Sequence, residues 1–426
     1  MAVCASVVAG WLMLVSCGGG QQGQAVEKIE SNEGGIKVLD VEKGVEQRDF
    51  VNLSKYATEI NYIPLETKLD CMMGVDQYTS ILKSGERFYF SSWLAEDPLF
   101  TFDESGKFLG IVGTKGRAAN EYMRRIKSFT ADEQSGELVI CDVTAKLLFY
   151  DSDGNFRISK QIERENRVFD YKLFSVGNRE YAFLKEDIYI KGVPQNFGLH
   201  KYKKESLVTV NSQGNIVDEK FVGDIYAYIH KTDHGTIGLN YGSPLLYQFD
   251  KKLGLLINDS LYHYNPADKS VECRYIVDFG KYYLGDESKH NAIIRGGNAL
   301  FFETGNFILF SVLFPYSAFP EMPNCYRFST FVFDKKSGDI QALEDDPIFG
   351  AARLKEGGSG FAGFTNDLDG GAPFVPRYIK DGKMYELMDA IRFIEQAQKS
   401  KSNKMKRVAA SLTEDSNPIL IEVVLK

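Results

Sequence analysis

The stretch LFTFDESGKFLGIVG, residues 99–113, places apolar-rich segments on both sides of a tight turn. Apolar and polar residues that alternate with a period of two are typical of a β-strand buried on one face. In the turn, Asp103 can accept hydrogen bonds from its own backbone and Gly106 can adopt a positive φ. The stretch therefore predicts a β-hairpin of two short strands.

The same pattern recurs along the chain. A looser copy, LLFYDSDGNFRISKQI, occupies residues 147–162, and the turns of the successive copies start at residues 103, 151, 211, 265 and 334. Each turn belongs to a unit of several short strands, which in the first unit are residues 77–83, 87–91, 99–103 and 108–112. Four short strands per repeat, separated by turn residues, indicate the blade of a β-propeller.

The later units are less regular. A third unit comprises residues 171–176, 180–183, 207–211 and 216–222. A fourth unit runs from residue 227 to residue 280 and contains strands at 236–239, 261–264 and 273–279, with an extra segment at 245–257. A fifth unit covers residues 291–343. Residues 378–384 suggest a hairpin fragment, while 384–398 has helical spacing that resumes at 405–412.

The C-terminal residues 419–425, ILIEVVL, predict a strand that must pair somewhere. We expect it to share a blade with an N-terminal strand, because an open ring would expose strand edges that promote aggregation. The fold predicted is all-β: a six-bladed β-propeller of four-stranded antiparallel blades, closed by the N- and C-terminal strands, with a small late helical insertion at about residues 384–412. It forms a single domain over residues 49–426.

The N-terminus has the features of a targeting segment. Residues 3–15 form an apolar run too short for a membrane span, and the following Ser16-Cys17 completes a sequence that resembles the bacterial lipobox. Residues 1–17 are therefore predicted to be a lipoprotein signal peptide, with Cys17 as the lipidated first residue of the mature protein. No Lys or Arg precedes the apolar run, and a plain secretory peptide is the alternative. Residues 18–48, rich in Gly, Gln, Glu and Lys, predict a flexible tether.

Composition limits the classes of function. The formal net charge of −8 and pI of about 5.4 argue against a nucleic-acid-binding protein, whose surface would be basic. Aromatic residues make up 13% of the chain, which favours pleated sheet. The four cysteines outside the signal peptide are Cys71, Cys141, Cys273 and Cys325. They lie far apart and form no C-x-x-C pair, which argues against a zinc ribbon; three disulfide connectivities remain open. Cys141 lies in a strand-like run and is expected to be a buried thiol.

Several segments together resemble a known family. They are YIPLET at residues 62–67, FDESGKFL at 102–109, the loop from Gly113 to Glu121-Tyr122, IVDFG at 276–280 and NPIL at 417–420. They are similar to the six-bladed β-propeller lipoproteins of Bacteroidetes, related to NHL- and TolB-like propellers. The resemblance implies a cell-envelope protein, lipid-anchored at the periplasmic face or the outer-membrane surface. The family loop reads G-x-x-G-x-G-P-x-E-Y, and here Arg117-Ala118-Ala119-Asn120 replaces its Gly-Pro portion.

That loop is the strongest candidate ligand-binding segment, through Lys115, Arg117, Glu121 and Tyr122. Loops on one face of a scaffold usually carry function. A phosphate-binding loop is disfavoured because the G-x-x-x-x-G-K-[ST] pattern is missing and no helix follows. The principal alternative is a plain crossover between two blades.

Two further patterns suggest a metal. His230 and His234 are four residues apart, which on a helix could hold zinc, but the segment has no helical period and a loop with solvated histidines is the default. Asp367 and Asp369 precede a glycine as in a calcium loop, but the glutamate that completes an EF-hand is missing, and a polar turn is the alternative. No cofactor is therefore predicted, with a divalent metal such as Ca²⁺ as the alternative.

No G-x-S-x-G or other nucleophile motif is present. Asp142, Asp278 and Asp286 could act as general acid or base only if they converge. We therefore expect a lipid-anchored envelope propeller that acts as a binding module for an unknown envelope protein or glycan, with no nucleic-acid partner and with membrane contact only through the anchor. A hydrolase or lyase with its site at the mouth of the central channel is the alternative, and a structural envelope protein is the second.

Overall fold

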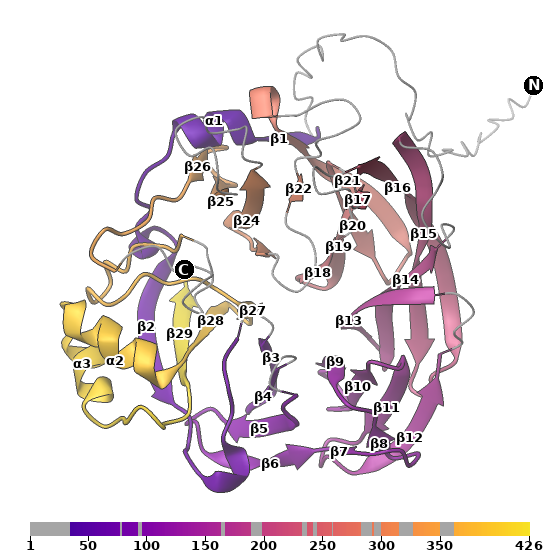
Figure 1. Ribbon diagram of the computed structural model, residues 1–426, viewed down its shortest axis with the longest axis horizontal. Helices are drawn as coiled ribbons and strands as arrows, with labels where there is room; N and C mark the ends of the chain where they lie inside the picture. Colours follow the sequence, from indigo (N-terminus) through magenta and orange to yellow (C-terminus); the bar gives the residue numbers. More distant parts are fainter. Residues whose placement is uncertain are drawn as a thin grey trace, which may run out of the picture. The chain divides into compact units, whose positions relative to one another are not determined.

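The computed structural model describes residues 35–426 except for 77–78, 93–95, 163–166, 189–197, 232–236, 242–244, 258, 283–291, 294–299, 315–326 and 350–361. Within this part of the chain, six sheets follow one another around a ring, each with its first strands innermost (Figure 1). The predicted six-bladed β-propeller is confirmed.

The first three blades follow each other in sequence. Blade 1 comprises β3 (Thr79–Ser84), β4 (Arg87–Ser92), β5 (Leu99–Asp103) and β6 (Phe108–Val112). Blade 2 comprises β9 (Ile126–Ala131), β10 (Leu138–Asp142), β11 (Lys146–Tyr150) and β12 (Phe156–Gln161). Blade 3 comprises β13 (Arg167–Gly177), β14 (Glu180–Ile188), β15 (Gly198–Asn211), β16 (Ile216–Lys231) and β17 (Ile237–Tyr241).

The other three blades complete the ring. Blade 4 comprises β18 (Leu245–Phe249), β19 (Lys252–Ile257), β20 (Ser260–Asn265), β21 (Ser270–Asp278) and the N-terminal β1 (Lys37–Asp40). Blade 5 comprises β22 (Ala292–Ile293), β23 (Phe301–Glu303), β24 (Phe307–Phe314), β25 (Arg327–Asp334) and β26 (Ile340–Ala342). Blade 6 comprises β27 (Tyr378–Lys380), β28 (Lys383–Met388), β29 (Ile419–Leu425) and β2 (Ala57–Pro64).

Blade 6 closes the ring as the sequence predicts. The N-terminal β2 pairs with the C-terminal β29 in antiparallel register, with Ile60 opposite Val423. In the middle of the blade β29 also pairs with β28, so it has a hydrogen-bonded neighbour on each side. A strand paired on both sides presents no free edge for association with another chain.

The N-terminal segment closes the ring a second time. We call residues 36–64 the N-terminal belt. Its β1 adds in parallel to the outer strand of blade 4, then α1 (Val41–Glu46) and a bridge from Asp49 to Leu343 follow blade 5, and β2 enters blade 6. Leu39 and Val41 are fully buried in this contact. The folded domain therefore begins near residue 36, whereas the sequence predicted a tether up to residue 48.

The core is divided among the blade interfaces. Six clusters of buried apolar side chains are found within the described residues, and each joins two neighbouring blades. In β4, Phe88 and Phe90 pack toward blade 6, while Tyr89 between them packs toward blade 2. A strand alternates its side chains between two faces, so one strand of a blade contributes to two interfaces.

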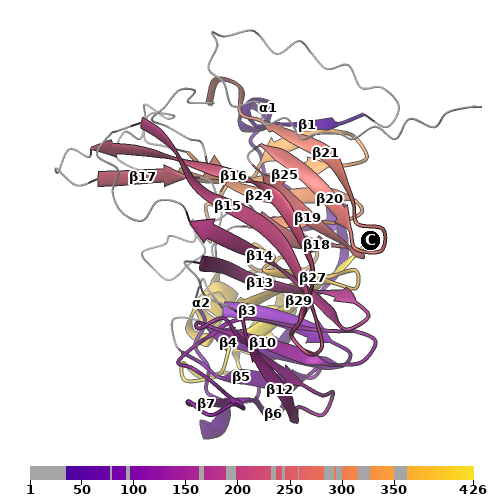
Figure 2. The same ribbon diagram turned by 90° about the vertical axis from the view of Figure 1, so that its right-hand side faces the viewer.

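Three sequence predictions of elements differ from the structure. Residues 236–239 were expected in the fourth unit, but β17 pairs with β16 and belongs to blade 3, on an arm that Figure 2 shows projecting beyond the neighbouring blades. The extra segment at 245–257 forms the two inner strands of blade 4. The helical spacing starts too early in the prediction: residues 383–388 form β28, and α2 begins after Asp389.

The helical insertion itself lies between β28 and β29. It consists of α2 (Ala390–Lys399) and α3 (Asn403–Ala409). Asp389 caps α2 by accepting a hydrogen bond from the backbone N–H of Arg392, and Ser402 caps α3 in the same way from Met405. No helix within the described residues is long and apolar enough to cross a membrane.

Candidate functional site

The connections between strands divide into two groups. In each antiparallel blade, the turns that follow the first and third strands lie at one end of the strands, which we call the hairpin face. The connections after the second strand and the crossovers between blades lie at the opposite end, which we call the crossover face. The predicted loop at residues 113–122 and the helical insertion both belong to the crossover face.

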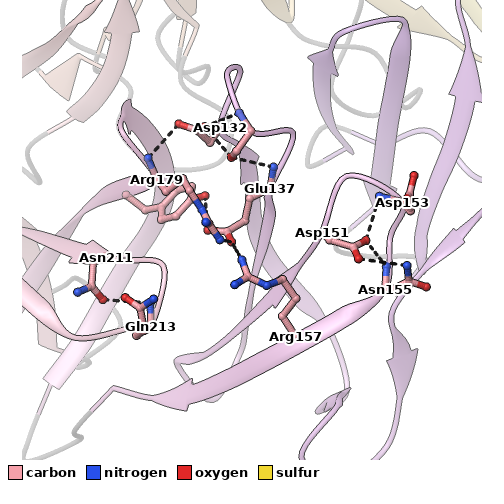
Figure 3. Close-up of polar contacts among 11 residues, drawn as sticks. Asp132, Glu137, Asp151, Asp153, Asn155, Arg157, Arg179, Asn211 and Gln213 are labelled. Carbon is pink, nitrogen blue, oxygen red and sulfur yellow. Dashed lines mark hydrogen bonds and ion pairs between the residues drawn. The ribbon is translucent and has the colours of Figure 1, made fainter.

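The hairpin face is built from repeated polar turns. The Oδ1 atom of Asp103 accepts hydrogen bonds from the backbone N–H groups of Ser105 and Lys107 at 2.9 and 3.0 Å. Asp151 and Asn211 hold their turns in the same manner, and both turns are visible in Figure 3. These short side chains satisfy the backbone of the turn and so explain why Asp, Asn and Gly recur at these places.

A buried carboxylate joins blades 2 and 3 on the hairpin face. Glu137 is 2% exposed, and its carboxylate contacts the guanidinium groups of Arg157 and Arg179. It also accepts a hydrogen bond of 2.9 Å from Tyr181 Oη (Figure 3). Burial raises the pKa of Glu137, and the hydrogen bond from Tyr181 and the charge of Arg179 oppose that rise. The group holds two blades together.

A second buried carboxylate joins blades 4 and 5. Glu303 accepts hydrogen bonds from Tyr247 Oη at 2.7 Å and Lys335 Nζ at 2.7 Å, and its Oε2 lies 2.8 Å from His263 Nε2. Burial alone would raise the pKa of Glu303, but the hydrogen bond with His263 and the charge of Lys335 outweigh it and hold this pKa below its usual value. Both carboxylates are thus engaged by cations of their own chain.

The predicted ligand loop lies on the crossover face between blades 1 and 2. Its two arms, β7 (Thr114–Lys115) and β8 (Glu121–Tyr122), pair in parallel, and Gly116 N donates to Tyr122 O at 3.0 Å. Gly113 begins the loop with φ of 77°, and a Cβ there would lie 2.7 Å from Tyr150 Oη. The segment is therefore a tightly closed crossover between two blades.

The four predicted binding residues of the loop have different environments. Lys115 Nζ pairs with Glu96 at 2.7 Å, whereas the carboxylate of Glu121 accepts the backbone N–H of Ala118 at 2.8 Å and stabilises the loop. Tyr122 is buried between the blades, and Arg117 is exposed. The loop therefore brings Lys115 and Tyr122 toward the connection between β4 and β5, which contains Glu96 and Asp97.

We call the group Asp76, Glu96, Asp97, Lys115, Tyr122 and Arg125 the junction site. Glu96 is fully paired: besides Lys115, Arg125 donates to it through Nε at 2.9 Å and Nη2 at 2.8 Å. These hydrogen bonds lower the pKa of Glu96. Glu96 therefore remains ionised and neutralised by its own chain.

Asp97 has the opposite environment. Its Oδ2 atom is buried and has no hydrogen-bond partner among the residues that the structure describes. Burial, with a contribution from the nearby charge of Asp76, raises the pKa of Asp97 to about 6, although the backbone N–H of Gly74 opposes the rise. Burial and Asp97 together also raise the pKa of Tyr122. The junction site therefore contains an acceptor oxygen, Asp97 Oδ2, to which no described residue donates.

Asp76 and Asp97 are the residues that sequence reasoning missed. Asp76 precedes β3, and its carboxylate accepts a hydrogen bond from Ser92 at the end of β4. The signal in the sequence was weak: Glu96-Asp97 is a charged pair between two apolar strands. It could have been noticed only by placing the connection between the second and third strands on the same face as the crossover loop.

The described candidates for metal ligands lie in two different parts of the fold. His230 lies in β16 opposite Gly238, so it is in a strand where the sequence predicted a loop, and His234 lies outside the described residues. Asp367 accepts from Ser54 N at 2.9 Å, and Asp369 accepts from Ser402 Oγ at 2.5 Å and Tyr62 Oη at 3.2 Å. In the described part of the chain, no three His, Cys, Asp or Glu residues are grouped to hold a metal. A metal here stays a prediction.

The remaining candidates are also distributed over the ring. Asp142 holds the turn after β10 by accepting the backbone N–H groups of Thr144 and Lys146, and Asp278 caps a turn at Gly280 in another blade. Asp286 lies outside the described residues. The described cysteines are free thiols, and Cys141 is buried as expected; Cys325 is not among them.

Comparisons with known proteins agree with this fold. A family model for a domain of unknown function (DUF4934) matches residues 36–424. A protein from Bacteroides fragilis that is described as exported has 15% sequence identity and a TM-score of 0.59, over 92% of this chain and 99% of that chain. The extracellular domain of a one-component system from B. thetaiotaomicron has 12% identity and a TM-score of 0.34, over 62% of this chain and 29% of that chain.

No curated protein sequence matches the chain. At 15% identity, the similarity to the exported protein shows the fold alone, and it confirms the resemblance to propeller proteins of Bacteroidetes. The family model begins where the N-terminal belt begins and ends within β29, so it spans the whole ring. The chain therefore belongs to the DUF4934 family.

Proposed function

We propose that the chain is a binding module of the cell envelope, which recognises a hydrogen-bond donor or cationic group of an envelope protein or glycan at the junction site. The observation that carries the proposal is the buried Oδ2 atom of Asp97, which lacks a donor within the described residues. An unsatisfied buried acceptor costs about 1–3 kcal/mol. A ligand N–H or O–H group that reaches this oxygen would recover that cost on binding.

The neighbours of Asp97 support this assignment. Glu96 is neutralised by Lys115 and Arg125, so it does not compete with Asp97 for a donor from the ligand. Tyr122 adds an aromatic side chain beside the carboxylate. Ligand sites generally combine apolar or aromatic surface with a few polar groups that set orientation. The junction site has this composition.

The test compares matched carboxylate variants. Tagged protein is used to capture partners from envelope extract and to probe a glycan array, as wild type, as Asp97→Asn and as the control Asp153→Asn. Asp153 is an exposed turn residue on the hairpin face. We expect wild type and Asp153→Asn to bind the same partner or glycan, and Asp97→Asn to lose it by about tenfold or more, as removal of a charged acceptor predicts. Equal binding by Asp97→Asn would contradict the proposal.

The envelope location rests on the Cys17 sequence and on relatives described as exported or extracellular. The experiment is incorporation of radiolabelled palmitate, with and without globomycin, into the protein and into a Cys17→Ala variant. We expect labelling of the wild type, sensitivity of its processing to globomycin, and loss of the label in Cys17→Ala. Unchanged labelling of the variant would exclude Cys17 as the anchor.

The pair Asp76 and Asp97 also favours a second candidate function. A carboxyl group whose pKa is raised into the neutral range suits a general acid when a second carboxyl group lies nearby, and burial raises the pKa of Asp97 to about 6. The protein would then be a hydrolase or lyase. A panel of envelope glycans is incubated with wild type and Asp97→Asn across the pH range. Product formed by wild type alone, with a rate that changes around pH 6, would favour the enzyme over the binding module.

A further inference from the structure

The helical insertion carries an excess of positive charge. Residues 396–413 contain four lysines, one arginine and no acidic residue, whereas the whole chain has a formal net charge of −8. Acidic residues only flank this stretch, at Glu395 on one side and at Glu414 and Asp415 on the other. Four of the five cations are exposed in the folded chain, and we call them the basic patch: Lys399, Lys401, Lys406 and Arg407.

The two helices hold the basic patch on a fixed support. Figure 1 shows α2 and α3, coloured yellow, on the outer side of blade 6. Phe393 on α2 and Met405 on α3 are fully buried in the core shared by blades 5 and 6. The fifth cation, Lys404, donates through Nζ to Ile60 O at 2.7 Å and so attaches α3 to β2. The basic patch therefore lies on the side of the insertion that faces solvent.

The cations of the basic patch have no acidic partner among the residues that the structure describes. Exposed lysines elsewhere on the ring form ion pairs: Lys68 with Glu66, Lys115 with Glu96 and Lys269 with Asp218. Asp369 lies beside the connection between the two helices, but it is engaged by Ser402 Oγ at 2.5 Å and Tyr62 Oη at 3.2 Å. The basic patch is therefore a surface of uncompensated positive charge on an acidic protein.

Helix stability accounts for only part of this charge pattern. Cations are favourable near the C-terminus of a helix and acids near its N-terminus. Lys399 ends α2, and Lys406 and Arg407 lie in the last turn of α3, as this rule favours. The first turn of α3 goes against the rule, because it contains Lys404 and no acid. The excess of cations therefore has a cause besides the stability of the helices.

The chemistry of the basic patch indicates an extended anionic surface as its partner. Three of its four residues are lysines, whose flexible point charges suit diffuse attraction, whereas recognition of one defined anion usually relies on the planar guanidinium of arginine. The patch covers the solvent-facing side of two helices, whereas small ligands generally bind in concave sites. A bilayer with anionic headgroups is an extended surface that attracts clustered Lys and Arg residues.

We propose that the basic patch binds the anionic headgroups of a bilayer and so turns blade 6 toward the membrane. The sequence predicts membrane contact only through the anchor, and the patch adds a second contact. Residues 18–35 connect the predicted lipidated Cys17 to the ring, and a chain of this length can span up to about 60 Å. The anchor by itself therefore leaves the orientation of the ring open. The inference rests on the envelope location in the proposed function and not on the junction site.

The test measures sedimentation of the protein with lipid vesicles. The mature chain, residues 18–426, contains the complete ring without a lipid anchor, and it is mixed with vesicles of phosphatidylcholine alone or of phosphatidylcholine and phosphatidylglycerol in equal parts. We expect binding to the mixed vesicles only. Added salt should release the protein, because the screening length falls from about 10 Å at 0.1 M to about 3 Å at 1 M. No binding to the mixed vesicles, or binding that salt does not weaken, would overturn the proposal.

Matched variants locate the binding. The patch variant removes all four charges of the basic patch: Lys399→Gln, Lys401→Gln, Lys406→Gln and Arg407→Gln. The control variant changes the net charge equally at four exposed lysines elsewhere on the ring: Lys68→Gln, Lys107→Gln, Lys251→Gln and Lys269→Gln. We expect the patch variant to bind the mixed vesicles about a hundredfold more weakly than wild type and the control by less than about tenfold. Equal losses in both variants, or no loss in the patch variant, would refute the assignment.

A charge-preserving variant guards against a folding defect in the helices. It carries Lys399→Arg, Lys401→Arg and Lys406→Arg, keeps every positive charge and should bind the mixed vesicles as wild type does. Loss of binding in this variant would show that charge is not the cause and would contradict the proposal.

Two further measurements separate this proposal from its alternatives. Dextran sulfate replaces the vesicles in the first, and a chain that bound this anionic polysaccharide but not the mixed vesicles would have a glycan as its partner, against the lipid assignment. Asp97→Asn is used in the second and should bind the mixed vesicles as wild type does. Failure of the vesicle test therefore leaves the proposed function of the junction site intact, whereas loss of vesicle binding in Asp97→Asn would contradict a contact through blade 6.

Discussion

The two faces of the ring use buried polar groups in different ways. On the hairpin face, Glu137 and Glu303 are each engaged by cations and a tyrosine from neighbouring blades, and short turns bind their own backbone. On the crossover face, Asp97 Oδ2 and Gln396 Oε1 are buried without a partner in the described part of the chain. The first arrangement fixes blades to one another. Under the proposed function, the second arrangement leaves Asp97 Oδ2 for a ligand, so stability and recognition belong to opposite ends of the same strands.

The largest loss of stability is expected from removing a paired carboxylate on the hairpin face. In Glu303→Ala, Lys335 and His263 remain buried without their acceptor. We expect the free energy of unfolding to fall by about 3–5 kcal/mol, as is usual when one partner of a buried charged group is removed. Urea denaturation measures it, with Glu272→Ala as control, because Glu272 pairs with Arg274 on the surface and should cost about 1 kcal/mol or less.

A second variant at the same position, Glu303→Gln, tests the charge of the carboxylate through its pH dependence. Since the pKa of Glu303 is lowered in the folded protein, its stabilisation is present above the unfolded pKa near 4.5 and is lost as the pH falls through the folded pKa. The difference between wild type and Glu303→Gln should therefore shrink in acid. A difference that grows in acid would contradict the assignment of Glu303 as an ionised carboxylate.

A smaller change, an increase in the free energy of unfolding, is expected from Glu386→Gln; Glu386 lies near the crossover end of β28. Burial raises the pKa of Glu386 to about 7, against the opposing charges of Arg392 and Arg377. The folded state thus keeps a proton that the unfolded state releases near the usual pKa of 4.5, so stability falls as the pH rises from about 4.5 to about 7. We expect Glu386→Gln to gain up to about 3 kcal/mol over wild type above this range and little below it. Thermal melting at several pH values measures the difference, and a gain independent of pH would contradict the burial of an ionisable group.

The third prediction concerns Asp97, whose pKa is raised less than that of Glu386 and whose side chain is partly exposed to solvent. Its pKa is raised from 3.8 to about 6, so its ionisation lowers stability as the pH rises through that range. Asp97→Asn should raise the melting temperature above pH 6, by an amount equivalent to about 1 kcal/mol or less after solvent screening, and should converge with wild type in acid. If Asp97→Asn instead destabilises the protein at neutral pH, then the carboxylate is structural like that of Glu303, and the contrast between the two faces fails at this residue.

The smallest change in stability is expected at Arg117, an exposed residue of the loop at residues 113–122. Arg117→Ala should change the free energy of unfolding by no more than about 0.5 kcal/mol, as is usual for exposed positions. Urea denaturation together with partner capture checks this expectation. A large loss of stability would show that the loop depends on Arg117, as it depends on Glu121.

The repeating hairpins could be predicted from the sequence, and the closure of the ring followed because an unpaired terminal strand would leave an exposed edge. An Asp or Asn followed by Gly makes a turn through bonds within a few residues, and alternating side chains make strands that are buried on two faces, so these features are local. The limits of local reasoning appear at residues 384–388, whose apolar residues suit a helix or a strand until β29 pairs with them. The N-terminal belt shows the same limit, because Leu39 and Val41 become a strand and a helix only against blades 4 and 5.

Which polar groups are paired could not be predicted from the sequence and is seen only in the folded chain. Glu96 and Asp97 are adjacent in the sequence, yet Lys115 and Arg125 neutralise Glu96, whereas burial near Asp76 leaves the Oδ2 atom of Asp97 without a donor among the described residues. Gln396 and Gln398 lie on one helix, yet Gln396 is buried and Gln398 is exposed. Desolvation and pairing depend on residues that come together from several blades, and no spacing along the chain encodes them.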